Sequence, residues 1–239
     1  MNEQTPTVVL VHGAFADSSS WNGVVERLQS HDYSVVAAAN PLRGLTGDAE
    51  YVRQLVASIE GPVVLVGHSY GGAVISNAAD GLDNVKALVF VAAFMPEKGE
   101  SALDIAGMFP GSTLGEALRP VPITLPDDSR TVDLYIDKSR FPHQFAADLP
   151  KETAAIMAAT QRPVTNAALA EPAFAAAWKE IPSWVLVATE DLNIPPQTQT
   201  FMAERADATS VSVAASHAVS VSRPVDVARL INEAAQAIT

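Results

Sequence analysis

The stretch VVLVGHSYGGAVIS, residues 63–76, decides the expected fold. Its apolar run at 63–66 predicts a buried strand, and the residues from 73 onward predict a helix. Between them lies the pattern G-x-S-x-G, which is typical of a sharp strand-to-helix turn with Ser69 at its apex. Gly67 and Gly71 flank the serine because larger side chains would clash where strand and helix approach each other. We therefore expect the Ser69 hydroxyl to lie above the carboxyl ends of a sheet, beside a helix N-terminus that favours negative charge.

Apolar runs and amphipathic stretches alternate along much of the chain, which is the pattern of βαβ units on a parallel sheet. Besides 63–66, the expected strands are 7–11, 33–38, 86–94, 184–188 and 210–214. Apolar residues recur at helical spacing in 21–28, 52–59 and 227–238. The sequence therefore predicts an α/β fold with about six mainly parallel strands flanked by helices.

The pattern changes between Phe94 and Pro182, where Pro, Phe and Met are more frequent and strand-like runs are short. Proline and aspartate residues at 120–128 indicate a loop or hairpin, and residues 148–159 and 171–179 are expected to form short helices. We interpret residues 95–181 as a cap inserted between two core strands and packed over Ser69. Residues 1–94 and 182–239 then form the core.

The composition narrows the class of protein. The 239 residues are 48% hydrophobic and 18% charged, as in an ordinary globular enzyme, and the net charge of -12 disfavours nucleic acid and anionic membranes as partners. Cysteine is absent, which excludes disulfides and thiolate catalysis. The N-terminal segment lacks the features of a secretory signal and no apolar run is long enough to span a membrane, so we expect a cytoplasmic protein. Its oligomeric state, monomer or homodimer, stays open.

A serine nucleophile needs a base, and the chain offers five histidines. His217 directly follows the expected strand 210–214, at the end of the sheet where Ser69 lies, so we interpret it as the base. His12 and His68 stand beside functional turns, where we expect loop support and packing respectively. His31 and His143 are expected in solvent.

The group that orients the base should follow the strand 184–188. Two carboxylates compete there, Glu190 and Asp191, and Asp191 is favoured because Ile194 and Pro195 follow it as in a common acid loop. Asp191 would accept the Nδ1–H of His217 and stabilise the imidazolium. Glu190 is then a neighbouring surface or salt-bridge residue.

Acyl transfer also needs donors for the oxyanion. The backbone N–H of Tyr70, directly after the nucleophile, is the first candidate. The second should come from the loop after the first strand, where Ala14 is favoured and Phe15 is the alternative. The residues expected to line a mostly apolar substrate pocket are Phe15, Trp21, Phe94, Met95 and Trp178.

These motifs together resemble the α/β-hydrolase superfamily along the whole chain. The phrases VHGAF at 11–15 and SHA at 216–218 are most similar to the branch that holds plant methylesterases, hydroxynitrile lyases and bacterial pyrethroid-type carboxylesterases. The resemblance implies Ser69, Asp191 and His217 as the catalytic triad, the amides of Ala14 and Tyr70 as the oxyanion hole, and no cofactor. Because few residues precede the first expected strand, we expect the sheet to lack the first two strands of the full superfamily fold.

Two departures bear on the reaction. Hydroxynitrile lyases carry a threonine in the first loop and a lysine after the catalytic histidine, where this chain has Gly13 and Ala218. Hydrolysis of carboxylic esters of small or medium uncharged molecules is therefore the simplest expectation, with no metal. Alternatives on the same triad are a lactonase, a perhydrolase, a cofactor-free oxygenase or a C–C hydrolase; another is a slow-turnover ligand-binding protein. A dinucleotide-binding oxidoreductase is excluded because no G-x-G-x-x-G motif is present.

Overall fold

The computed structural model describes residues 5–125 and 128–238. Pro126 and Asp127, in the expected hairpin region, and the first four residues of the N-terminal segment lie outside these ranges. No helix within the described part of the chain is long and apolar enough to cross a membrane.

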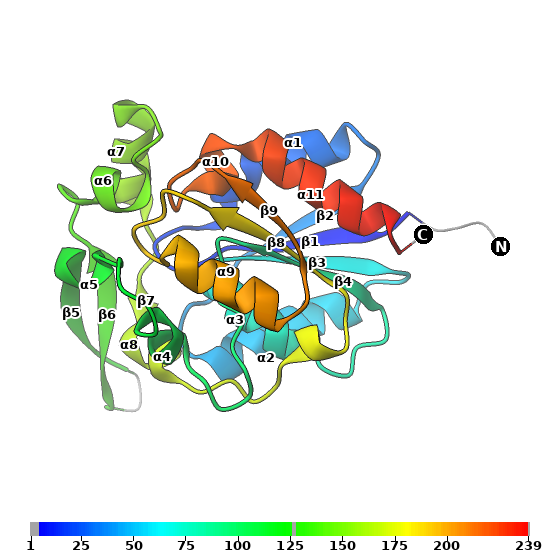
Figure 1. Cartoon of the computed structure of the whole chain (residues 1–239). Coiled ribbons are helices and arrows are strands. Elements are labelled where there is room, and N and C mark those ends of the chain that lie inside the picture. Colours follow the sequence, from blue (N-terminus) through cyan, green and yellow to red (C-terminus); the bar gives the residue numbers. More distant parts are fainter. Residues whose placement is uncertain (1–4, 126–127, 239) are drawn as a thin grey trace.

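A six-stranded sheet in the order β2-β1-β3-β4-β8-β9 forms the centre of the molecule, and every neighbouring pair in it is parallel (Figure 1). Its strands are β1 (Thr7–Val11), β2 (Ser34–Ala38), β3 (Val63–His68), β4 (Val85–Val91), β8 (Ser183–Ala188) and β9 (Thr209–Val213). The strand order reverses at β1 and β3, where two neighbouring strands lead into loops that diverge. In open parallel sheets such a point is where ligands bind.

The inner strands are mostly apolar because helices cover both faces of the sheet. Alternate residues face opposite sides: Val9 and Leu65 belong to one buried cluster, and Leu10 and Val66 to the other. The helices α2 (Leu45–Ala57), α3 (Tyr70–Ala78) and α9 (Pro196–Arg205) cover the first face. The helices α1 (Asn22–Gln29) and α11 (Pro224–Gln236) cover the second, next to the short helix α10 (Val219–Ser222).

The segment between β4 and β8 forms an addition at the carboxyl end of the sheet, on the opposite side of the molecule from the chain termini (Figure 1). It contains a three-stranded antiparallel sheet in the order β5-β6-β7. Its strands are β5 (Leu118–Thr124), β6 (Arg130–Ile136) and β7 (Val164–Thr165). Its helices are α4 (Ala102–Ala106), α5 (Leu114–Ala117), α6 (Phe141–Phe145), α7 (Lys151–Thr160), α8 (Asn166–Ala170) and the 3-10 turn η2 (Ala177–Lys179). The hairpin expected around 120–128 is therefore present as β5 and β6.

The helix expected over residues 171–179 was wrong: only the last three of these residues form a 3-10 turn. Glu171 precedes Pro172 and has extended backbone angles, as a following proline favours. The amides of Phe174 and Ala175 donate to the side-chain oxygen of Asn77, at 2.8 and 2.9 Å, instead of to helical carbonyls. A tertiary contact thus replaces the local structure that the alanine-rich sequence favours.

Candidate active site

Ser69 lies at a strained turn between β3 and α3. Its φ of 54° is in the left-handed region that residues other than glycine rarely adopt. The Ser69 carbonyl accepts from the amides of Gly72 at 3.0 Å and Phe94 at 3.1 Å, which holds the turn in place. A Cβ on Gly67 would lie 2.5 Å from the Gly71 oxygen, and a Cβ on Gly71 would lie 2.4 Å from the Val11 oxygen. The glycines expected around the serine are therefore required by close backbone approach.

Three side chains from separate strand ends form one hydrogen-bonded line. His217 Nε2 lies 2.9 Å from Ser69 Oγ, and His217 Nδ1 lies 2.7 Å from Asp191 Oδ2. Both His217 and Asp191 are buried. Because a carboxylate only accepts, Nδ1 carries the proton when the imidazole is neutral, and Nε2 is then free to accept the Ser69 proton. Glu190, the competing carboxylate, is exposed to solvent.

Four donors surround the Asp191 carboxylate. Oδ1 accepts from the amides of Asn193 at 2.7 Å and Ile194 at 3.1 Å. Oδ2 accepts from Gln199 Nε2 at 2.9 Å in addition to His217. Gln199 itself is oriented because its Oε1 accepts from the Ala188 amide and its Nε2 donates to the Ile194 carbonyl. Asp191 is thus held in one orientation behind the imidazole.

Two backbone amides near Ser69 are available to an incoming oxyanion. The N–H groups of Ala14 and Tyr70 have no acceptor among the described residues, and both residues line the cavity that contains Ser69. The N–H of Phe15 donates instead to the Arg162 carbonyl at 3.0 Å. Between the two residues proposed for the second donor, the geometry therefore favours Ala14.

The cavity around Ser69 has a volume of about 290 Å³. Phe15 and Phe94 contribute aromatic walls, and the inserted segment supplies much of the remaining lining through α4, α5, β5, β6 and α8. The polar side chains in the lining belong to Ser69, Tyr70, Ser112, Asn166 and Asn193, and no charged residue takes part. Such a lining suits an uncharged organic molecule. Among the described residues, no group of three His, Asp or Glu side chains is placed to hold a metal ion.

The other three residues expected at the pocket lie elsewhere. Trp21 is fully buried on the other face of the sheet, where its ring meets His68 edge-on at 6.2 Å between centroids. Met95 is buried beside Met202, whose sulfur accepts its amide. Trp178 is buried under the Arg205 guanidinium and donates from Nε1 to the Pro96 carbonyl. These side chains pack within the protein, and none of them lines the Ser69 cavity.

Comparison with known proteins assigns the family. The model of the alpha/beta hydrolase family matches residues 8–230. This chain belongs to the alpha/beta hydrolase family. It is 31% identical over 255 aligned residues to the alpha/beta hydrolase nvfD of Aspergillus novofumigatus, covering 96% of each chain. It is 25% identical to the putative chloroplastic methylesterase 11 of Arabidopsis thaliana, over 70% of this chain and 47% of that protein.

Solved structures share the fold of this hydrolase. Polyneuridine aldehyde esterase superposes with a TM-score of 0.84 at 19% identity, over 96% of this chain and 99% of the esterase. A pyrethroid hydrolase from Sphingobium faniae superposes with a TM-score of 0.79 at 24% identity, over 98% of both chains. The expected α/β-hydrolase fold and the resemblance to the methylesterase and pyrethroid-hydrolase branch are confirmed.

The inserted segment also supports the hydrolase's candidate base, which the sequence did not reveal. The Phe145 ring meets the His217 ring edge-on at 4.9 Å between centroids, and its carbonyl accepts from the Ala218 amide at 2.9 Å. From the core, His68 Nε2 donates to the His217 carbonyl at 2.8 Å. Phe145 lies 72 positions from His217 in the sequence, in a helix of five residues, and no pattern in the sequence connects the two.

A hydrogen-bonded network ties the residue after the candidate nucleophile to the inserted sheet. The Tyr70 hydroxyl donates to Asp48 Oδ2 at 2.8 Å, and both Asp48 oxygens accept from the Arg43 amide at 3.1 Å. The Arg43 guanidinium in turn pairs with Asp133 of β6 at 2.6 Å. Burial raises the pKa of Asp48 and, together with the neighbouring Asp48 charge, also raises the pKa of the Tyr70 phenol. The Tyr70 side chain therefore helps α3 to hold the Tyr70 backbone amide in place.

Stability should fall in mild acid because two histidines are buried without a charge. Burial lowers the pKa of His12, and burial followed by the neighbouring His217 lowers the pKa of His68 well below 6.5. Below pH 6.5 the unfolded chain therefore binds more protons than the folded chain, which favours unfolding. We expect His68 to make the free energy of unfolding fall by up to about 1.4 kcal/mol per pH unit as the pH drops below 6.5, measured by urea unfolding between about pH 7 and pH 5. His12 contributes in the same direction.

The variant His68→Gln should reduce this pH dependence by about one proton. His31→Gln is the matched control, because it replaces an exposed histidine and leaves both buried histidines in place. An equal slope in wild type and His68→Gln would contradict the assignment of a neutral buried His68.

Proposed function

We propose that this hydrolase cleaves carboxylic esters of small or medium uncharged molecules through an acyl-enzyme on Ser69. The observation that carries the proposal is the line from Ser69 through His217 to Asp191, opening on an uncharged cavity. The esterases and methylesterases among the similar proteins support the same reaction class. The family accounts for hydrolase chemistry, and the choice of nucleophile and substrate is our proposal.

The reaction would begin when Ser69 Oγ attacks the ester carbonyl carbon while its proton passes to His217 Nε2. The tetrahedral oxyanion would receive hydrogen bonds from the Ala14 and Tyr70 amides, which are worth a few kcal/mol each at the transition state. His217 then gives its proton to the alkoxy oxygen as the C–O bond breaks, leaving an acyl group on Ser69. Water attacks this acyl group while His217 takes a proton from the water. His217 then returns this proton to Ser69 Oγ as the bond between Oγ and the acyl carbon breaks, and the carboxylic acid leaves.

Cyanohydrin cleavage is disfavoured by the local packing. A Cβ on Gly13 would lie 2.5 Å from the Ser69 Cβ, so this backbone has no space for the threonine of hydroxynitrile lyases. Ala218, in the place of their lysine, is buried and offers no positive charge to a leaving cyanide.

Labelling with a fluorophosphonate tests the proposal directly. An activated serine attacks the phosphorus, fluoride leaves, and a stable phosphonyl adduct remains. We expect one adduct, mapped by mass spectrometry to the peptide that contains Ser69, and slower labelling in the presence of p-nitrophenyl butyrate. The denatured protein should not react. Labelling at another serine, or none in the folded protein, would refute Ser69 as the nucleophile.

A further inference from the structure

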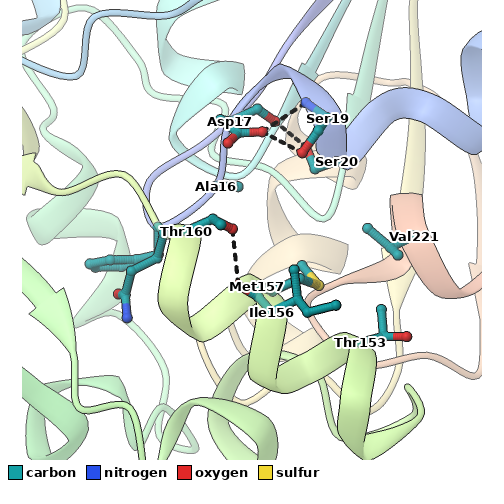
Figure 2. Close-up of a pocket in the computed structure, with 11 residues that line it drawn as sticks. Ala16, Asp17, Ser19, Ser20, Thr153, Ile156, Met157, Thr160 and Val221 are labelled. Atoms are coloured by element: carbon teal, nitrogen blue, oxygen red, sulfur yellow. Dashed lines mark hydrogen bonds between the residues drawn. The ribbon is translucent and has the colours of Figure 1, made fainter.

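A second cavity lies between the segment after β1 and helix α7 of the insertion (Figure 2). Its volume is about 200 Å³. One wall comes from residues 15–17, 19 and 20, the opposite wall from α7 with Gln161, and Val221 of α10 closes one side. In Figure 2 the side chains of Ile156 and Met157 lie on the wall formed by α7. We call this cavity the α7 groove.

Most polar groups of the α7 groove are already paired within the protein. The hydroxyls of Ser19 and Ser20 donate to Asp17, and the Thr160 hydroxyl donates to the Ile156 carbonyl at 3.0 Å. The Gln161 side chain accepts from the Ile136 amide and donates to backbone carbonyls. Ile156 by contrast leaves 65% of its surface exposed. The groove therefore offers apolar contact to a ligand, and the nearby Asp17 carboxylate disfavours an anionic one.

Phe15 lines both the α7 groove and the Ser69 cavity. Its side chain is 3% exposed, and its φ of 61° places it in the left-handed region. The Phe15 amide donates to the carbonyl of Arg162, two residues after the end of α7. The wall that the two cavities share is therefore held from the core and from the insertion. Phe15 also directly follows Ala14, whose amide is proposed to bind the oxyanion.

The geometry points to Phe15 as the residue that sets the length limit of the substrate: it closes the Ser69 cavity against the α7 groove and stops an apolar chain of the ester from extending into that groove. This inference rests on the proposed ester hydrolysis at Ser69. The chain concerned is an uncharged alkyl or aryl group on either the acyl or the alcohol side of the ester. Replacing Phe15 by a smaller residue would join the two cavities. The preference of the enzyme should then shift toward esters with longer chains.

The test compares chain-length profiles of wild type, Phe15→Ala and the milder Phe15→Leu. We expect the ratio of kcat/KM for octanoate over butyrate p-nitrophenyl esters to rise by about tenfold in Phe15→Ala and by less in Phe15→Leu. A buried methylene contributes up to about fourfold, so four additional methylenes supply this factor even when only part of the chain is covered. A parallel series of alkyl acetates, followed by acid release, tests the alcohol side. The series whose chain-length ratio changes shows whether the acyl or the alcohol group of the ester faces Phe15.

Filling the groove provides the matched control. Phe15→Ala with Ile156→Trp should return the ratio toward the wild-type value, because the indole occupies the space that was opened. Phe15→Ala with Gln54→Trp, at an exposed position of α2 that lines neither cavity, should keep the higher ratio. Thermal unfolding of each variant reports whether it is folded, and Phe15→Leu serves if Phe15→Ala is not.

Fluorophosphonate labelling separates the two possible failures. A folded variant that labels at Ser69 but keeps the wild-type ratio in both ester series would overturn the role of Phe15 and leave the proposed function intact. A wild-type protein that neither labels at Ser69 nor hydrolyses any of the esters would overturn the proposed function, and the role of Phe15 with it.

Discussion

Replacing Ser69 by alanine is expected to lower kcat/KM for p-nitrophenyl acetate by about 10⁵-fold or more. The variant removes the hydroxyl oxygen that lies 2.9 Å from His217 Nε2, so no acyl-enzyme can form at this position. The elbow should survive, because the Ser69 carbonyl rather than its hydroxyl accepts the hydrogen bonds from Gly72 and Phe94. Stopped-flow and steady-state release of p-nitrophenol measure the effect.

Ser76→Ala is the matched control for this change. Ser76 is a buried serine of α3 whose hydroxyl donates to the Gly72 carbonyl at 2.9 Å and does not line the cavity. Its loss should leave kcat/KM near the wild-type value. Wild-type turnover by Ser69→Ala would end the proposal of a serine nucleophile. A single burst without further turnover in the wild type would instead indicate a slow-turnover ligand-binding protein.

Replacing Asp191 by asparagine is expected to lower kcat by about 10⁴-fold. Oδ1 accepts from two backbone amides, so the asparagine oxygen must stay there and its NH₂ group must face His217 and Gln199. His217 Nδ1 would then have to accept a hydrogen bond, which puts the imidazole proton on Nε2. In that tautomer Nε2 cannot take the proton of Ser69.

The same variant should also lose stability, because Gln199 cannot turn away from the new NH₂ group. Its amide is fixed by the Ala188 N–H and the Ile194 carbonyl. Two facing donors inside the protein leave at least one unsatisfied, at a cost of about 1–3 kcal/mol. Glu190→Gln removes the neighbouring exposed carboxylate and is expected to change neither kcat nor the unfolding midpoint. A loss of activity in Glu190→Gln, with activity retained in Asp191→Asn, would reassign the acid.

Local patterns accounted for the parallel sheet and its flanking helices. The apolar runs at 63–66 and 184–188 predicted strands that the structure contains, because each run must be buried on both faces. Local patterns were less reliable in the insertion. There the amides of residues 174 and 175 donate to the Asn77 side chain instead of to helical carbonyls, and no α-helix forms. Ser69, Asp191 and His217 were proposed as a triad from their positions at strand ends. In the structure His217 lies within hydrogen-bond distance of the other two.

Aromatic residues near motifs were a weaker guide to the pocket. Trp21 lies close in sequence to the loop after β1, yet helical periodicity turns its ring to the opposite face of the sheet. Phe15 and Phe94 lie in the loops that begin at the ends of β1 and β4, and both do line the cavity. Distance along the chain therefore predicted pocket residues only where a strand end, and not a helix face, set the direction of the side chain.

By itself the sequence determined the turn around Ser69 and the succession of strands along the chain, because glycine spacing and apolar periodicity act over a few neighbouring residues. Its composition also determined the absence of a thiol. The tertiary structure alone decided that Phe145 packs on His217, that Gln199 orients Asp191 and that Phe15 divides two cavities. These contacts join residues far apart in the chain or depend on the shape of the space between elements. Their energies arise from close packing in three dimensions, and no local pattern of residues records them.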